Sequence, residues 1–186
     1  AEASVILHSQ VKNRLTEIEK VVVRTHESAI RIISKTGILA NPADRDHCLQ
    51  YMIAVPLAFV SLNADHYEDN FHHAHPVIDA LRSKMEIVED KRFTTEYLDA
   101  DKRSIANAIQ VFFKDGSSTE EVVVEYPVGH RLRREEGIPL LKQKFKTNLA
   151  SRFPSQQCQK ILTLCENQGM LEVTPVSHFM DLFVID

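Results

Sequence analysis

The almost wholly apolar segment 49–60 constrains the fold of this chain most strongly. Its last ten residues, 51–60, contain no charged or amide side chain. A membrane-spanning helix needs about 20 such residues, so we expect this segment in a protein core. It is preceded by Asn41, Pro42 and Asp44, the capping amide, first-turn proline and acid that favour a helix start. The pattern predicts one helix after Asn41, buried on nearly all sides, which Pro56 bends or ends.

The other hydrophobic patterns predict a mixture of helices and strands. Alternating β-branched and aromatic residues indicate a strand at 18–25 and a hairpin at 105–126 that turns at 115–118. Apolar residues at helical spacing indicate further helices at residues 2–12, 26–37, 76–85, 138–149, 154–169 and 174–183. We therefore predict an α+β fold in which helices pack with a small antiparallel sheet and C-terminal helices follow.

The composition is that of a globular protein, with 44% hydrophobic and 26% charged residues in a chain of 186, enough for one domain or one and a half. A net charge of −4 argues against a nucleic-acid binder, which would carry a basic stripe. Cys48, Cys158 and Cys165 are too few and too scattered for a disulfide framework or an iron–sulfur cluster. We therefore expect a reducing compartment and no metal.

The polar residues between Asn41 and the apolar run are the most unusual in the chain. On a continuous helix, Asp44, His47, Cys48 and Tyr51 would share one face. The imidazole of His47 could transfer a proton, and Tyr51 could donate a hydrogen bond to a developing negative charge. This face is either the edge of an active site or a polar helix start whose groups are satisfied by nearby backbone.

Two further clusters have both a functional and a structural interpretation. His72, His73 and His75 are metal-ligand types, but Pro76 follows at once and no second ligand pair lies nearby, which favours a surface loop. The Gly-His-Arg-Leu-Arg-Arg sequence at 129–134 could bind carboxylates through its arginines. It could equally form local ion pairs with the two glutamates that follow it.

Several stretches of the chain resemble the MmgE/PrpD family of enzymes. They occur in the family's order: RTHE at 24–27, NPADRDHCLQYM at 41–52, DKRSIANA at 101–108, EYPVGH at 125–130, GIP at 137–139 and KF at 144–145. Family members are longer, with a large all-helical domain followed by an α+β lid domain. The resemblance covers residues 1–186 and implies that they are the C-terminal lid portion, without the N-terminal helical domain, and that the last helices, 138–186, pack as a subregion.

The resemblance also implies a reaction, the dehydration of 2-methylcitrate to 2-methyl-cis-aconitate in propionate breakdown, with no cofactor. By position, Tyr51 matches an active-site tyrosine of the family, and we expect a catalytic role for His47 beside it as an acid, a base or a carboxylate contact. His8 does not match the family's active-site histidine, because the chain begins just after that segment, as an excised fragment would. The expected substrate contacts are Asp46, Arg131, Arg133 and Arg134.

Partners and location follow from the same resemblance. Most catalytic groups should come from the missing helical domain, so we expect the 186 residues alone to be inactive. We expect a homodimer, a tricarboxylate substrate, and no nucleic acid or membrane partner. The expected location is the mitochondrial matrix in a eukaryote, which we prefer, or the cytoplasm in a bacterium. The alternatives are decarboxylation of cis-aconitate or epimerisation of an imino acid within the family, and a stand-alone α+β module that binds acidic ligands through residues 131–134.

Overall fold

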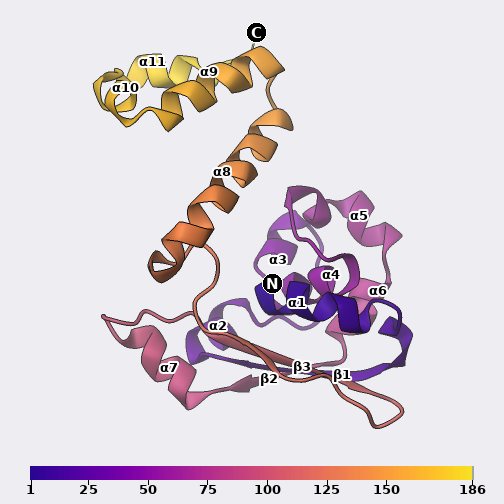
Figure 1. Ribbon diagram of the computed structural model, residues 1–186. Coiled ribbons are helices and arrows are strands. Elements are labelled where there is room, and N and C mark those ends of the chain that lie inside the picture. The colour runs from indigo at the N-terminus through magenta and orange to yellow at the C-terminus, as the bar shows by residue number, and fades with distance from the viewer. Residues whose placement is uncertain (186) are drawn as a thin grey trace. The chain divides into compact units, whose positions relative to one another are not determined.

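The computed structural model describes residues 1–185, which form two compact units (Figure 1). Unit 1, Ala1–Pro127, contains helices and the only sheet of the described residues, and unit 2 begins at Val128 and is helical. The predicted α+β class is confirmed.

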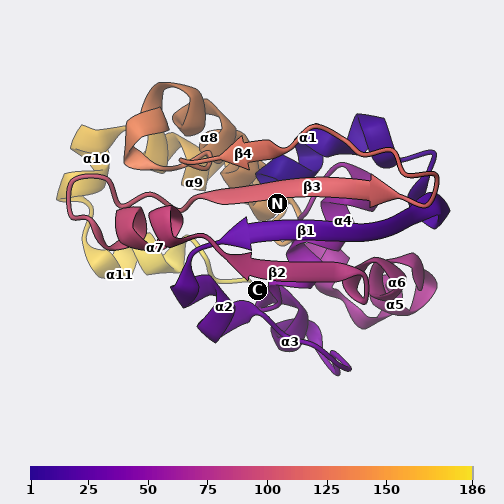
Figure 2. The same cartoon turned by 90° about the horizontal axis from the view of Figure 1, so that it is seen from below.

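The sheet of unit 1 has four strands in the order β2-β1-β3-β4 (Figure 2). These are β1 (Ile18–Thr25), β2 (Met85–Glu89), β3 (Asn107–Phe113) and β4 (Val122–Val124). The predicted strand at 18–25 and the predicted hairpin are confirmed, since β3 pairs antiparallel with both β1 and β4.

The predicted small antiparallel sheet is in fact mixed, because β2 pairs with β1 in parallel. The helix predicted at 76–85 ends at Arg82, and Met85 begins the strand instead of continuing the helix. Met85–Glu89 reads Met-Glu-Ile-Val-Glu, whose partial alternation suits a strand, and the backbone N–H of Val21 bonds to the carbonyl of Lys84 at the strand's entrance. Pairing with a strand about 64 residues earlier decides the conformation here.

Helices cover one face of this sheet. Unit 1 contains α1 (Glu2–Val11), α2 (Glu27–Ile33), α3 (Pro42–Asp46), α4 (Leu49–Phe59), α5 (Asp69–Ala74), α6 (Val77–Arg82) and α7 (Lys91–Leu98), with short 3-10 turns η1 (Leu15–Glu17) and η2 (Ala64–Tyr67). Helices α1, α4 and α6 lie on the face that is turned away from the viewer in Figure 2. The main core lies between these helices and the strands, and includes Leu7, Ile53, Leu57, Val21 and Ile109.

The ends of helices α2 and α4 can be compared with the sequence prediction. Helix α2 ends at Ile33, and Gly37 lies beyond it in a loop, where its φ of 92° requires glycine-like freedom. Helix α4 continues past Pro56 to Phe59 and ends at Val60, which takes the left-handed conformation. The burial predicted for α4 on nearly all sides is confirmed for most of its residues.

Unit 2 contains the short turn η3 (Arg131–Arg133) and helices α8 (Arg134–Ala150), α9 (Ser155–Glu166), α10 (Gln168–Val173) and α11 (Val176–Asp181). Leu149, Cys158 and Ile161 form its small core, which the partly buried Phe153 and Phe183 extend. Gly169 lies inside α10 and does not end the preceding helix as predicted. In the described part of the chain, no helix is long and apolar enough to cross a membrane.

Candidate functional site

The segment 41–52 forms two helices, so the prediction of one continuous helix is wrong. The side chain of Asn41 caps α3 by accepting the backbone N–H of Asp44 at 2.9 Å, as its sequence predicts. His47 then leaves helical geometry and Cys48 is extended (φ −120°, ψ 110°), so α4 starts afresh at Leu49. The shared face that a single helix would give to these polar residues therefore does not exist.

His47 lies at the junction between these helices, with its side chain 67% exposed. Its Nδ1 is in contact with the carboxylate of Asp46, the preceding residue. This contact favours a proton on Nδ1 and leaves Nε2 available toward solvent. The carboxylate of Asp46 thus orients the imidazole of His47.

Tyr51 is placed differently, because its side chain is fully buried in α4. Its hydroxyl donates a hydrogen bond of 2.6 Å to the backbone carbonyl of His66. Burial is the main reason that its pKa is raised to about 12, so the phenol keeps its proton at neutral pH. The ring packs near those of Tyr67 and His72, at centroid distances of 5.9 and 5.6 Å. No contact joins Tyr51 to His47 in the described residues.

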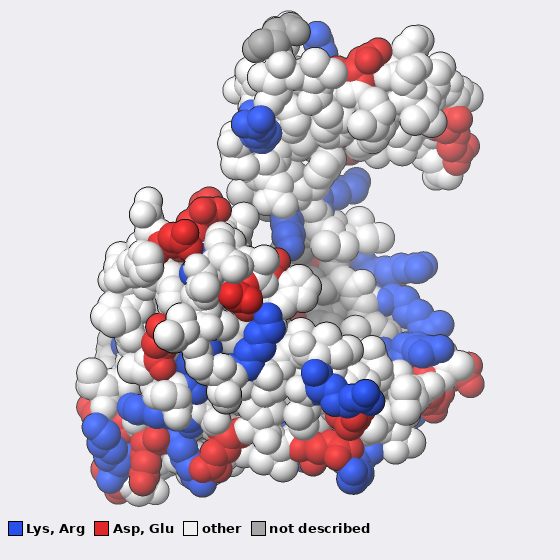
Figure 3. Space-filling view, turned by 180° about the vertical axis from the view of Figure 1, so that it is seen from behind, with Lys and Arg blue, Asp and Glu red and all other residues white. Residues whose placement is uncertain are grey.

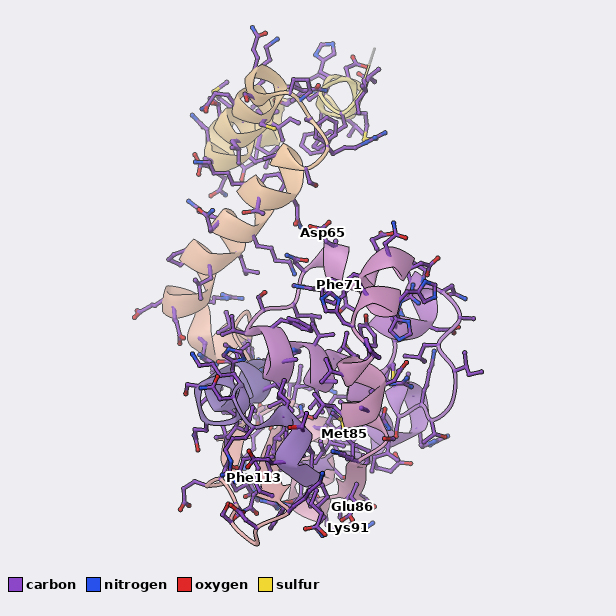
Figure 4. All side chains as sticks on the ribbon, turned by 90° about the vertical axis from the view of Figure 1, so that its right-hand side faces the viewer. Asp65, Phe71, Met85, Glu86, Lys91 and Phe113 are labelled. Atoms are coloured by element: carbon purple, nitrogen blue, oxygen red, sulfur yellow. The ribbon has the colours of Figure 1, made fainter. Side chains whose placement is uncertain are left out.

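Arg45 is the buried centre of this region, and the sequence reading did not single it out. Its side chain is 1% exposed, and its Nε donates to the carbonyl of Tyr67 at 2.6 Å. Its two terminal nitrogens reach Leu39 O, His72 Nδ1 and the carboxylate of Asp69. One guanidinium therefore ties α3 to the loop before it and to the segment 64–74, which Asp65 and Phe71 mark in Figure 4.

The three histidines lie in and after helix α5, so the prediction of a surface loop is wrong there. His72 is 11% exposed, and its Nε2 lies 3.0 Å from the carboxylate of Asp79. An arginine only donates hydrogen bonds, so the contact from Arg45 makes Nδ1 of His72 the acceptor and places the proton on Nε2. His75 Nδ1 instead bonds to the carbonyl of Phe71 at 2.7 Å. Among residues 1–185, no group of three or more His, Cys, Asp or Glu side chains is arranged to hold a metal ion.

A pocket of about 540 Å³ opens beside these residues in unit 1. The loop after α2, the end of α6 and the start of β2 line it, together with Gln50 and His72. Among its lining residues are the cations Lys35 and Arg82 and one carboxylate, Asp79. Sequence patterns gave no signal for this site, because its walls come from segments about 50 residues apart.

The arginine cluster belongs to unit 2. Arg131 and Arg133 are in η3, and Arg134 begins helix α8. Arg133 makes a two-pronged ion pair with Glu136, with nitrogen–oxygen distances of 2.9 and 2.6 Å. One of the two interpretations of the cluster, local ion pairs with the glutamates that follow it, therefore holds for Arg133.

Acidic and basic side chains are interspersed over the face of unit 1 shown in Figure 3.

Comparison with known proteins gives one consistent family. The model of the MmgE/PrpD C-terminal domain matches residues 1–168. The 2-methylcitrate dehydratase of Escherichia coli (strain K12) is 52% identical over 99% of this chain, and that of Cupriavidus necator is 51% identical over 99%. The mitochondrial 2-methylcitrate dehydratase of Yarrowia lipolytica is 48% identical over 98%. The chain spans 38% of the length of each bacterial relative and 35% of the yeast one. This chain therefore belongs to the MmgE/PrpD family, of which it carries the C-terminal domain.

Proposed function

We propose that these residues are the C-terminal portion of an enzyme that dehydrates 2-methylcitrate to 2-methyl-cis-aconitate. The observation that carries the proposal is the 52% identity over 99% of the chain to an enzyme named 2-methylcitrate dehydratase. The proposed domain assignment is a C-terminal α+β portion over residues 1–186, preceded in the complete enzyme by a helical domain. The helices from about residue 138 onward are proposed to pack as a subregion of that portion.

The chemistry requires three kinds of group. A base removes a proton next to a carboxylate, an acid protonates the departing hydroxyl, and hydrogen-bond donors stabilise the enediolate-like charge that develops. Cationic side chains are also needed to hold the substrate's three carboxylates. The reaction needs no redox step, and we propose that it uses no cofactor.

We propose His47 and Tyr51 as the catalytic residues of this portion. His47 is exposed, its Nδ1 contacts Asp46, and its Nε2 is therefore suited to exchanging a proton with a substrate. Tyr51 keeps its proton at neutral pH, so it is suited to donating a hydrogen bond to a negative charge. For that role its hydroxyl would have to exchange the carbonyl of His66 for the substrate.

We propose Asp46 and the arginines at 131, 133 and 134 as substrate contacts. The geometry supports Asp46 chiefly through its orienting contact with His47. Arg133 would exchange the carboxylate of Glu136 for one of the substrate's, a replacement of like by like. Arg134 begins α8 and is exposed.

We further propose that the remaining catalytic groups come from the part of the relatives that this chain does not cover, and that the complete enzyme is a homodimer. The 186 residues alone should therefore bind substrate weakly and turn it over slowly or not at all. The yeast relative is named as mitochondrial, so a eukaryotic form of this enzyme is proposed to work in the mitochondrial matrix and a bacterial form in the cytoplasm.

A chimera tests this proposal. The matching C-terminal 38% of the Escherichia coli enzyme is replaced by these 186 residues, and formation of the conjugated double bond from 2-methylcitrate is followed by ultraviolet absorbance. We expect a folded chimera with dehydratase activity and an isolated chain without it. A folded chimera that decarboxylates cis-aconitate but leaves 2-methylcitrate intact would favour the alternative family activity.

A second experiment keeps the proposal testable if the chimera does not fold. Antibodies against the 186 residues are used to deplete an extract of source cells grown on propionate. We expect the 2-methylcitrate dehydration activity to be removed together with a polypeptide much larger than 21.2 kDa. Activity that remains after complete depletion, or a captured polypeptide of only this size, would instead favour a stand-alone binding module.

A further inference from the structure

The segment 63–75, which contains η2 and α5, packs against Tyr51 with little burial of its own. Every residue in it keeps part of its surface exposed to solvent. The backbone carbonyl of His66 accepts the hydroxyl of Tyr51 at 2.6 Å. The carbonyl of Tyr67 accepts Nε of Arg45, also at 2.6 Å. A segment held by few buried contacts opens at a low cost in free energy, so this one can open while the rest of unit 1 stays folded.

His66 holds the start of this segment together. Its Nδ1 accepts the backbone N–H of Asn63 at 2.9 Å, and the side chain of Asn63 accepts the backbone N–H of His66 in return. Such a reciprocal pair, a capping box, fixes the first turn of a helix. The imidazole must be neutral here, because a protonated ring carries an N–H on both nitrogens and has no acceptor to offer. The turn η2 therefore keeps this conformation only while His66 lacks its second proton.

The surroundings of His66 favour the neutral form. Its ring is partly buried near those of Phe59 and Phe71, at centroid distances of 6.5 and 4.7 Å. Burial is the main reason that the pKa of His66 lies below its ordinary value of 6.5, while Asp65 raises this pKa and His75 lowers it. An opened segment therefore takes up the proton more readily than the closed one. The closed form is fully stable above pH 6.5 and loses stability as the pH falls below it.

The other two partly buried histidines of the segment have less to lose on protonation. His75 donates from Nδ1 to a backbone carbonyl one turn earlier, at 2.7 Å, a hydrogen bond that either charge state can make. His72 lies between a cation and an anion, Arg45 on α3 and Asp79 on α6. A second proton on His72 would remove the long contact of 3.4 Å from Arg45 but strengthen the one with Asp79. We therefore assign the response to His66.

We propose that the segment 63–75 is a pH-sensitive clasp on Tyr51, which neutral His66 keeps closed and protonated His66 opens. Loss of the capping box unwinds η2, and the carbonyl of His66 then moves away from the hydroxyl of Tyr51. The hydroxyl becomes free to donate to another molecule. The clasp is a property of unit 1 that is measured without substrate, so it stands or fails separately from the proposed function.

Hydrogen exchange of the 186-residue chain tests the clasp. Mass spectrometry follows deuterium uptake by residues 63–75 at about pH 7.5 and about pH 5, on either side of the ordinary histidine pKa, and each rate is divided by the intrinsic rate at that pH. We expect the protection of this segment to fall roughly fivefold or more in acid, the effect of losing one hydrogen bond, whereas strand β1 keeps its protection. Equal losses in both segments would show general unfolding of unit 1 and would overturn the proposal, as would unchanged protection of residues 63–75.

Two histidine variants separate the clasp from other effects of acid. His66→Gln cannot be protonated, yet its side-chain oxygen can accept the N–H of Asn63, since glutamine is favoured at this position of a capping box. We expect residues 63–75 of this variant to be equally protected at both pH values. His73→Gln, which changes an exposed histidine of the same segment, is the matched control and should respond to acid as the parent does. A response that persists in His66→Gln, or that disappears in His73→Gln, would overturn the proposal.

An NMR titration of the parent chain keeps the test decisive if His66→Gln does not fold. The backbone amide of Asn63 and the Cζ signal of Tyr51 should shift with the same midpoint pH as the imidazole of His66. That midpoint should lie below the ordinary histidine value of 6.5. Signals of Asn63 and Tyr51 that follow another histidine, or that do not change with pH, would overturn the proposal.

Discussion

The hydroxyl of Tyr51 donates a hydrogen bond of 2.6 Å to the backbone carbonyl of His66, which joins the buried helix α4 to the turn η2. The hydroxyl that we propose as a donor to the substrate is thus held by a structural contact here. Its ring is enclosed by the neighbouring rings of Tyr67 and His72. Stability measurements can therefore separate the contribution of the Tyr51 hydroxyl to the free energy of unfolding from the contribution of its ring.

Tyr51→Phe should lower the free energy of unfolding by about 1–2 kcal/mol, because the partly buried hydrogen bond to the carbonyl of His66 is lost while the ring remains. Urea denaturation of the 186-residue chain measures the change. Tyr97→Phe is the control: its ring stacks on His26, and its hydroxyl makes no hydrogen bond in the described residues. Equal stability losses in the two variants would contradict the importance assigned to the Tyr51 contact.

The alkaline limit of stability should also depend on Tyr51. Burial raises its pKa from 10.0 to about 12, so between these values the unfolded chain releases a proton that the folded chain keeps. The free energy of unfolding therefore falls as the pH rises from about 10 to 12, and this contribution is fully present below pH 10. Denaturation curves at several pH values should show a shallower alkaline decline for Tyr51→Phe. Parallel declines in the parent and the variant would be the contrary result.

Arg45→Met should be among the most damaging substitutions in unit 1. It removes hydrogen bonds to the carbonyls of Tyr67 and Leu39 and the contact with Asp69, and we expect a loss of about 2–4 kcal/mol. Arg45→Lys should recover only part of this, since an ammonium cannot reproduce the planar fork. The control Arg31→Met affects an exposed ion pair and should cost less than about 0.5 kcal/mol. Guanidinium denaturation measures the change in the free energy of unfolding. A loss below about 1 kcal/mol for Arg45→Met would contradict the structural importance assigned to Arg45.

Two glycines within helices of unit 2 should respond oppositely to alanine. A Cβ on Gly137 would lie 3.0 Å from the backbone nitrogen of Gly129, so Gly137→Ala should destabilise unit 2 although alanine favours helices. At Gly169 the nearest atom is the side-chain oxygen of Asn167 at 3.7 Å, and Gly169→Ala should stabilise by about 0.5–1 kcal/mol. Thermal unfolding of the two variants measures the difference. A gain in stability from both would show that the Gly129 contact is readily relieved.

Much of the local structure follows from the sequence alone. The strand at Ile18–Thr25, the helix cap at Asn41 and the hairpin after Asn107 rest on patterns within a few residues, so short-range physical chemistry determines them. The sequence of segment 41–52 also predicts that the apolar residues from Leu49 onward form a buried helix. What it could not give is the break at His47 and Cys48, which separates polar side chains that an unbroken helix would have gathered.

Only the tertiary structure decided the rest. Arg45 stands between two acidic residues in the sequence, yet its partners Tyr67 and Asp69 lie 22 and 24 residues further along the chain. The parallel pairing of β2 and the pocket around Arg82 likewise depend on segments that meet only after folding. A local pattern records backbone preference and the side of an element that faces the core. The burial of a charge and the partner that compensates it are set by distant residues, and they become visible only in the folded chain.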